Sequence, residues 1–264
     1  MKKGLDAFTP SQVASLRIFI GSIVFIPVAI HSIRHLKIKN GFYILLIGFF
    51  GTGIPPFLFT QAQTVINSST AGMLNSLTPL FALVIGFVFF KMKMEMYKIT
   101  GVLLGLAGAA ALFIFKSDGN LNVNAYGLLV VLAAVLYAVS STLIKIRLQQ
   151  MNPLHITSFI FLFVGPPAGV YLLFSDLPKS FEHPLAWQSF SYILILGLVN
   201  TALVTFLFNK LIRNSSAIFA QSVTYLMPVV AILWGILDGE TLGFIDFAGI
   251  AFILSGIYLI NKRG

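Results

Sequence analysis

The chain has 264 residues and a formal net charge of +9, yet 58% of its residues are hydrophobic and only 9% are charged. Soluble domains are about 25% charged, so this composition excludes a soluble globular protein and indicates an integral membrane protein. The positive charges lie in short segments between apolar runs, where they face anionic lipid, so nucleic acid is excluded as a partner.

Nine apolar runs follow one another along the chain, each near the roughly 20 residues that a transmembrane helix needs. The first run has the full spanning length and lacks the small-residue cleavage pattern of a signal peptide, so it is predicted to remain as a helix. The sequence therefore predicts an all-α integral membrane protein with nine transmembrane helices. In chain order the runs cover residues 12–31, 41–61, 70–90, 99–115, 125–145, 154–174, 190–209, 218–237 and 244–260.

The Lys and Arg residues divide unequally between the two sides of the membrane. When the connecting segments are assigned alternately, twelve fall on one side and four on the other, with Arg17 inside the first run. By the positive-inside rule, the side with twelve is cytoplasmic. We therefore predict a multi-pass protein of a bacterial cytoplasmic (inner) membrane, with a cytoplasmic C-terminus and Met1 outside.

Short motifs recur at a nearly constant distance, which indicates an internal repeat. Phe-Leu-Phe occurs at 57–59 and 206–208, and Pro79-Leu-Phe-Ala-Leu matches Pro228-Val-Val-Ala-Ile. Five crossings separate equivalent positions, and because five is odd, the second copy is predicted to be inserted in the opposite sense. The copies are assigned to residues 1–116 and 125–262 of a single membrane domain.

The first copy is one helix shorter than the second. Extending the repeat backwards aligns Pro10 with Pro153, so the run at 125–145 has no counterpart in the first copy. We expect that Met1 is an internal start and that a helix precedes it. The alternative is a nine-helix product that leaves one copy's groove open to lipid.

Several motifs occur in a characteristic order over essentially the whole chain. The first copy has Pro10-x6-Arg17-x3-Gly21, Leu-Thr-Pro at 77–79 and Gly101-x6-Gly108. The second copy has Tyr137-Ala138 with Lys145, Met227-Pro228, and Gly239-Glu240-x8-Gly249-x6-Gly256. This pattern resembles the drug/metabolite transporter superfamily, EamA type. The resemblance implies two five-helix repeats, of which this chain lacks the first helix, and transport of a modest polar metabolite such as an amino acid.

Polar residues at helical spacing within the runs are expected to face the bundle interior or a wet cavity. Gln221, Thr224, Tyr225 and Pro228 share one face of the eighth run, and Asn75, Thr78 and Pro79 are their counterparts on the third. A proline leaves a backbone carbonyl without a donor and bends the helix, so Pro79 and Pro228 are predicted kink or gating positions. The alternative is that the polar groups only join helices, each contributing about 1 kcal/mol or less.

Three further spans carry candidate polar residues. Tyr137 and Ser141 lie one turn apart in the fifth run, and Thr201 begins a stripe in the seventh, with Asn200 beside it. Arg17 either contacts a substrate anion or caps backbone carbonyls of neighbouring helices, and Ile160 at the equivalent position of the second copy favours the structural role. The predicted substrate-binding residues are Asn75, Thr78, Tyr137, Ser141, Asn200, Thr201, Gln221, Thr224 and Tyr225.

Together these patterns predict a carrier that exports its substrate by alternating access about a mid-membrane cavity between inverted repeats. The chain has no Cys, no HExxH pair and no buried acid pair, so we expect neither an enzyme nor a metal or cofactor site. The alternatives are a non-transporting scaffold or helper subunit and an inactive truncated transporter. The expected partners are a small-molecule substrate and the lipid bilayer, and Gly101-x3-Gly105 permits close helix packing within the chain or in a homodimer.

Overall fold

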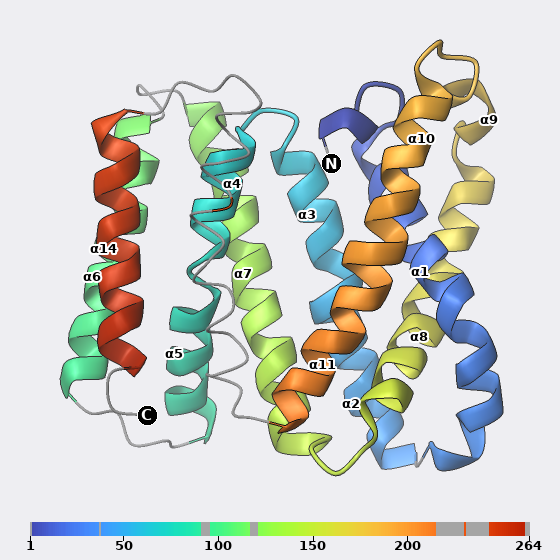
Figure 1. Ribbon diagram of the computed structural model, residues 1–264, viewed down its shortest axis with the longest axis horizontal. Helices are drawn as coiled ribbons and strands as arrows, with labels where there is room; N and C mark the ends of the chain where they lie inside the picture. The colour runs from blue at the N-terminus through green and yellow to red at the C-terminus, as the bar shows by residue number, and fades with distance from the viewer. Residues whose placement is uncertain are drawn as a thin grey trace.

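A computed structural model of the protein describes residues 2–36, 38–90, 96–116, 121–214, 230 and 243–261. All regular structure in these ranges is helical (Figure 1). The elements, in chain order, are η1 Lys2–Gly4, α1 Pro10–Ser32, η2 Ile33–His35, α2 Ile38–Gly48, η3 Phe49–Gly53, α3 Ile54–Ala62, α4 Ser68–Asn75, α5 Thr78–Phe90, α6 Met96–Lys116, α7 Leu121–Arg147, α8 Pro153–Phe174, α9 Leu177–Ser180, α10 Ala186–Ile195, η4 Leu196–Leu203, α11 Val204–Asn214 and α14 Phe244–Asn261.

Six segments of the described chain are long and apolar enough to cross a membrane, which confirms the predicted all-α membrane class. They are Pro10–Ser32, Asn40–Ala62, Thr70–Phe89, Ala125–Arg147, Pro153–Phe174 and Ala186–Asn214. Two more helices, α6 and α14, coincide with the predicted runs at 99–115 and 244–260. The run at 218–237 lies outside the described residues.

The first helix of the bundle and its sequence counterpart α8 begin in the same way. Thr9 precedes α1 and forms a reciprocal capping box with Gln12, in which the Gln12 N–H donates to Thr9 Oγ1 at 3.3 Å and the Thr9 N–H donates to Gln12 Oε1 at 2.9 Å. Asn152 precedes α8 and accepts from the Leu154 N–H at 3.0 Å. A proline follows each cap, where its missing N–H leaves no helical hydrogen bond unmade.

Two membrane-crossing segments contain a π-helical turn instead of a continuous α-helix. In Asn40–Ala62 the turn is η3, between α2 and α3, and in Ala186–Asn214 it is η4, between α10 and α11. When the two Phe-Leu-Phe motifs are aligned, η3 corresponds to residues 198–202, which lie within η4. Such turns widen the helix locally and often occur at functional sites.

The helices that correspond in sequence lie beside each other in space. α1 packs along α8, and α6 packs along α14. In Figure 1, α1 runs downwards and α8 upwards, and α6 runs upwards while α14 runs downwards to the C-terminus. Each corresponding pair of helices is therefore antiparallel.

The buried apolar side chains form two main clusters, one on either side of α7. One joins α1, α2, α8 and α11 and includes Ile18, Ile47 and Phe161, and the other joins α4, α5, α6 and α14 and includes Leu77 and Ile253. Helix α7 contributes Ile144 to the first cluster and Val130 to the second. Helix α7 therefore connects the two halves of the core.

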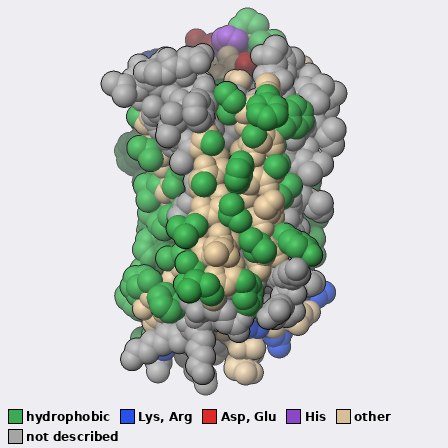
Figure 2. All heavy atoms as spheres, turned by 90° about the vertical axis from the view of Figure 1, so that its left-hand side faces the viewer, with side chains coloured by type: hydrophobic (Ala, Val, Ile, Leu, Met, Phe, Trp, Pro, Cys, Tyr) green, Lys and Arg blue, Asp and Glu red, His purple; other side chains and the backbone are tan. Residues whose placement is uncertain are grey.

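The surface has the distribution expected of a membrane protein. Figure 2 shows the face that carries α6 and α14, with hydrophobic side chains over its middle, Lys and Arg at its lower end, and Asp, Glu and a histidine at its upper end. The basic residues of the described helices agree, because Lys145 and Arg147 are in the last turn of α7 and Arg213 is in the last turn of α11. These two helix ends meet, since Lys145 Nζ donates to the Ile212 carbonyl oxygen at 3.3 Å.

Candidate functional site

The clearest polar contact inside the bundle joins Arg17 of α1 to Thr201 of η4. The Arg17 Nε donates a hydrogen bond to Thr201 Oγ1 at 3.0 Å, and both residues are buried, with 7% and 3% of their surfaces exposed. Tyr137 of α7 lies close enough to the Arg17 guanidinium for their charges to influence each other. Two predicted substrate residues, Tyr137 and Thr201, are therefore near the predicted anion contact.

The π-helical turn and a glycine make this contact geometrically possible. Thr201 Oγ1 donates to the carbonyl oxygen of Leu196, five residues earlier, at 3.2 Å while it accepts from Arg17. A Cβ at Gly197 would lie 2.9 Å from side-chain atoms of Ile20 and 3.3 Å from the Arg17 carbonyl oxygen. Because Gly197 has no side chain, α1 approaches η4 closely enough for the Arg17 side chain to reach Thr201.

Asn75, Thr78 and Pro79 lie where the third membrane-crossing segment is interrupted. α4 ends at Asn75, α5 begins at Thr78, and Pro79 has no N–H to donate to the Asn75 carbonyl oxygen. The Thr78 hydroxyl takes that place, donating to the Asn75 backbone oxygen at 2.6 Å, and it lies 3.4 Å from Asn75 Oδ1. All three residues are buried, so the interruption is an internal polar site.

Helix α7 carries a row of hydroxyl groups that bond in two different ways. Ser141 and Thr142 both donate to the Ala138 carbonyl oxygen of their own helix, at 3.1 and 2.7 Å. Ser140 instead donates across to the Ile47 carbonyl oxygen of α2 at 3.1 Å. Tyr137 packs beside the ring of Phe59 on α3, with ring centroids 6.2 Å apart. The predicted Tyr137 and Ser141 are thus near the contact of α7 with α2 and α3.

Of the remaining predicted residues, one, Asn200, falls within the described part of the chain, and it is outside this arrangement. Asn200 is exposed, although its neighbour Thr201 is buried. Gln221, Thr224, Tyr225 and Pro228 lie outside the described residues.

One buried polar pair was not among the predicted site residues. Asn209 Nδ2 on α11 donates to Thr157 Oγ1 on α8 at 2.9 Å. The sequence indicated Asn209 only through its place on the polar helix face that begins at Thr201. Thr60, the counterpart of Asn209 in the first copy, is also fully buried. No sequence pattern connected Asn209 to Thr157, because they lie on different helices.

A crevice of 190 Å³ opens between α1, η3, α3 and α8. It is apolar and is lined by residues that include Phe49, Phe57 and Pro167, and none of the predicted substrate residues lines it. Pockets for drug-sized ligands have volumes of roughly 300–1,000 Å³, so this crevice is smaller than such a site. No three His, Asp or Glu side chains within the described ranges come together as metal ligands.

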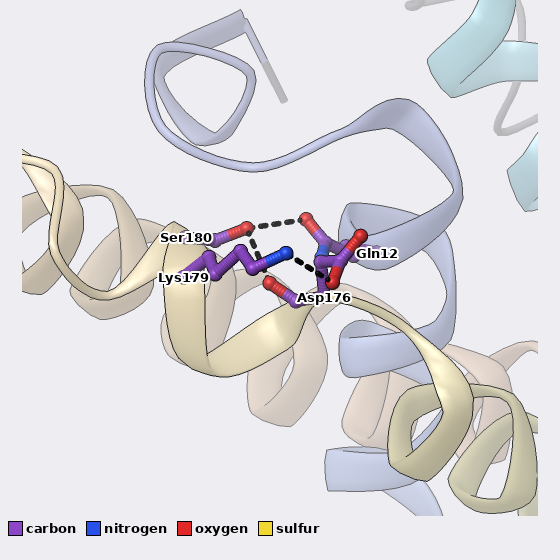
Figure 3. A network of polar contacts seen from close by, with 4 residues as sticks. All are labelled: Gln12, Asp176, Lys179 and Ser180. Atoms are coloured by element: carbon purple, nitrogen blue, oxygen red, sulfur yellow. Dashed lines mark hydrogen bonds and ion pairs between the residues drawn. The ribbon is translucent and has the colours of Figure 1, made fainter.

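The upper end of α1 is held by a polar contact to the short helix α9, which follows α8 (Figure 3). Gln12 Oε1 accepts from Ser180 Oγ at 3.0 Å, in addition to its bond with the Thr9 N–H. Beside them, Lys179 Nζ and Asp176 form an ion pair of 3.1 Å, with both side chains more than three-quarters exposed. Gln12 is 2% exposed, so it is the buried member that connects α1 to α9.

The two halves of the chain match one family model. The model describes the EamA-like transporter family, and it matches residues 1–114 and again residues 125–262. The chain belongs to the EamA-like transporter family.

Relatives of this EamA-like chain are named as transporters. An "Uncharacterized transporter" of Archaeoglobus fulgidus is 26% identical over 265 residues, which cover 100% of this chain and 92% of the relative. The "Uncharacterized inner membrane transporter YedA" of Escherichia coli K12 is 27% identical over 272 residues, covering 98% of this chain and 83% of YedA. A solved crystal structure superimposes with a TM-score of 0.69 at 17% identity, covering 98% of this chain and 90% of the other, which shows a shared fold. The protein is thus an integral membrane protein of a transporter family.

Proposed function

We propose that this EamA-like protein carries a small polar metabolite, such as an amino acid, across a bacterial cytoplasmic membrane by alternating access. The substrate would be exported. The C-terminus would lie in the cytoplasm, because α14 ends at the lower end of the bundle, where the basic last turns of α7 and α11 also lie. In this mechanism the two copies are inverted repeats that rock about a polar site between them.

The observation that carries the proposal is a reciprocal contact between corresponding glycines of α6 and α14. A Cβ at Gly108 would lie 2.7 Å from the Gly249 carbonyl oxygen, and a Cβ at Gly256 would meet the Gly101 carbonyl oxygen. In the repeat, Gly101 corresponds to Gly249 and Gly108 to Gly256. A contact in which residue i of one copy meets residue j of the other, and j meets i, is typical of a two-fold axis. Together with the antiparallel helix pairs, it supports inverted repeats.

The proposed substrate site lies where helices are interrupted near the contact of the copies. Thr201 is within a π-helical turn, and Asn75 and Thr78 flank a helix break. At both places polar side chains lie beside backbone that departs from the regular α-helix. In membrane proteins such irregular backbone is tolerated where it is buried or lines a cavity, and transporters bind substrates at such positions. Tyr137 and Ser141 of α7 complete the described part of the site, and Gln221, Thr224 and Tyr225 are proposed to complete it from the eighth run.

Counterflow in proteoliposomes tests this function. The purified chain is reconstituted, loaded with a panel of amino acids and other polar metabolites, and assayed for exchange of labelled substrate. We expect exchange that is lost in Thr201→Val and retained in Thr201→Ser, because serine keeps the hydroxyl. Folding of each variant is checked by its elution and circular dichroism. Absence of exchange for the whole panel with a folded wild-type chain would favour the scaffold alternative.

A further inference from the structure

The apolar crevice between α1, η3, α3 and α8 is a groove in the surface that faces lipid. Three buried lining residues form its floor: Ile18, Val164 and Ala168. Three others form its rim and are partly open: Phe49 is 39%, Ile54 38% and Tyr171 41% exposed. Because α1, η3, α3 and α8 all belong to membrane-crossing segments, the groove opens onto the hydrocarbon of the bilayer.

The crevice runs along α8 within one half of the height of the bundle. Its lining on this helix extends from Val164 to Tyr171, which is about 10 Å of helix. This half of α8 points away from the basic last turns of α7 and α11 (Figure 1). One leaflet contributes about half of the roughly 30 Å hydrocarbon core. The crevice therefore has the direction and length of part of one lipid acyl chain.

The volume and the lining of the crevice also favour an apolar guest. A cavity of about 150 Å³ lined by Leu, Ile and Phe remains dry and accepts small apolar molecules, and this crevice has 190 Å³. Among the described residues that line it, Tyr171 alone has a polar side-chain group. A polar metabolite in the crevice would lose its hydrogen bonds to water without replacing them, which is unfavourable.

The second copy has larger side chains at the equivalent positions of α1 and α8. When these two helices are aligned, Phe161 corresponds to Ile18 and Phe25 corresponds to Ala168. The two phenylalanine rings are buried and stacked, with centroids 5.3 Å apart and an angle of 3° between their planes. They occupy the space that Ile18 and Ala168 leave open in the first copy.

Gly53 of η3 is the second small residue of the crevice. Its counterpart in the alignment of the Phe-Leu-Phe motifs is Ala202. A Cβ at Gly53 would lie 3.5 Å from Val164 Cγ1 and from the Gly48 carbonyl oxygen, and 3.6 Å from Phe49 Cδ1. Val164 and Phe49 both line the crevice, so this Cβ would extend into it at ordinary contact distances. The crevice is thus open because two side chains are small, and not because of the position of a helix.

We propose that this crevice binds one acyl chain of a bilayer lipid, from the leaflet away from the basic ends of α7 and α11. The acyl chain fills the space that Gly53 and Ala168 leave beside Ile18. It supplies the van der Waals contacts that a gap in a close-packed interior would lose. The inference rests on the membrane location of the protein and not on the transport of a substrate.

A photoactivatable lipid tests this proposal. The protein is reconstituted in liposomes of phosphatidylethanolamine and phosphatidylglycerol that contain some phosphatidylglycerol with a diazirine in the middle of one acyl chain. After illumination, mass spectrometry of peptides locates the adducts on the floor residues Ile18 and Val164. Leu103, 61% exposed on α6, is the reference for ordinary lipid contact.

Two variants close the crevice, and a third is their matched control. Ala168→Phe places a ring in it, as Phe25 does in the second copy, and Gly53→Ala adds one methyl group without a clash. Leu173→Phe adds a ring to the same helix α8 at a residue that is 83% exposed. Elution and circular dichroism show which variants are folded, and Gly53→Ala decides the test if Ala168→Phe is not.

We expect the wild type to form adducts at Ile18, Val164 and Leu103. In Ala168→Phe the adducts at Ile18 and Val164, relative to those at Leu103, should fall about tenfold or more, because an acyl chain beside the ring would overpack the site. Gly53→Ala should give a smaller decrease, and Leu173→Phe should give none.

Three outcomes overturn the proposal. Adducts at Leu103 without any at Ile18 and Val164 would show that no acyl chain enters the crevice. Unchanged adducts in every folded closing variant would show that lipid reaches the floor residues by another route. Labelling of these residues by free leucine that carries a diazirine, with none by the lipid, would assign the crevice to an apolar substrate. Because no transport is measured, a failure of this proposal leaves the proposed function untouched.

Discussion

Ser22 on α1 lies against Gly165 on α8, so closely that a Cβ at Gly165 would overlap the serine side chain. Each residue is the other's counterpart when Pro10 is aligned with Pro153. Two corresponding residues that touch each other are what a two-fold axis between the copies would predict. Only one of them carries a side chain, which allows the helices to pack without a gap or an overlap.

This contact predicts an exchangeable pair. Gly165→Ser places two serines where one fits, and overpacking of this kind destabilises by about 1–3 kcal/mol. Adding Ser22→Gly restores a single side chain, so the double variant Gly165→Ser/Ser22→Gly is expected to recover most of the loss. Denaturant unfolding in detergent, followed by circular dichroism, measures the difference. The control is Gly41→Ala, because nothing lies within 4 Å of a Cβ at Gly41.

Equal destabilisation in the single and double variants would contradict this prediction. It would mean that Gly165 is needed for a reason other than the space taken by Ser22.

The bond between Arg17 and Thr201 predicts a coupling between helices of the two copies. Thr201→Val removes the acceptor of the Arg17 Nε, and a lost hydrogen bond to a charged group reduces the free energy of unfolding by about 1.5–3 kcal/mol. Arg17→Ile introduces the residue type that the second copy has at the equivalent position, Ile160. In a double-mutant cycle the two changes are expected to be non-additive by about 1 kcal/mol or more. Additive effects would show that the bond contributes nothing to the free energy of unfolding.

The two contacts in Figure 3 are expected to differ in strength. Gln12→Leu removes the acceptor shared by the Thr9 N–H and Ser180 Oγ, and loss of an N-terminal capping interaction costs about 1 kcal/mol. Asp176→Asn breaks the ion pair with Lys179, but both of these side chains are highly exposed and solvent screens the interaction. Thermal unfolding should therefore show a lowered midpoint for Gln12→Leu and an almost unchanged one for Asp176→Asn. The reverse order would contradict the assignment of Gln12 as the connecting residue.

Much of the helical arrangement follows from the sequence, because apolar length and repeated motifs are local or pairwise signals. The Phe-Leu-Phe motifs identified the two segments that later proved to contain η3 and η4. The π-helical turns themselves were not predicted, since one extra residue in a turn leaves no mark on an apolar run. η4 packs against α1, and η3 packs against α7 and α8, and a sequence pattern does not contain such contacts.

The candidate site was predictable as a set of polar residues but not as a set of contacts. Arg17 and Thr201 are 184 residues apart, and nothing in either run indicated that they would bond. Asn200 and Thr201 were placed together because they are adjacent, yet one is exposed and the other buried. Adjacent residues of a helix face different neighbours, so only the structure shows which of the two faces the interior.

The helix break before Pro79 predicts that transport depends on Asn75. Asn75→Leu replaces a buried amide beside the break with an apolar side chain, and we expect flux in proteoliposomes to be abolished while the chain stays folded. Thr64→Val is the control, because Thr64 is an exposed threonine whose hydroxyl donates to the carbonyl of Gln61, three residues earlier, as the buried Thr78 hydroxyl donates to that of Asn75. Flux of this control should equal that of the wild type. Full flux in Asn75→Leu would remove Asn75 from the proposed substrate site.

The orientation of the bundle predicts which ends react with a membrane-impermeant maleimide. Ile38 is 96% exposed at the start of α2, on the end where the basic last turns of α7 and α11 lie, and Lys179 is exposed on the opposite end. The positive-inside rule predicts that the first end is cytoplasmic. Lys179→Cys should therefore be labelled in intact cells, and Ile38→Cys only after the membrane is permeabilised. The unsubstituted chain, which has no cysteine, provides the background, and labelling of Ile38→Cys in intact cells would reverse the orientation.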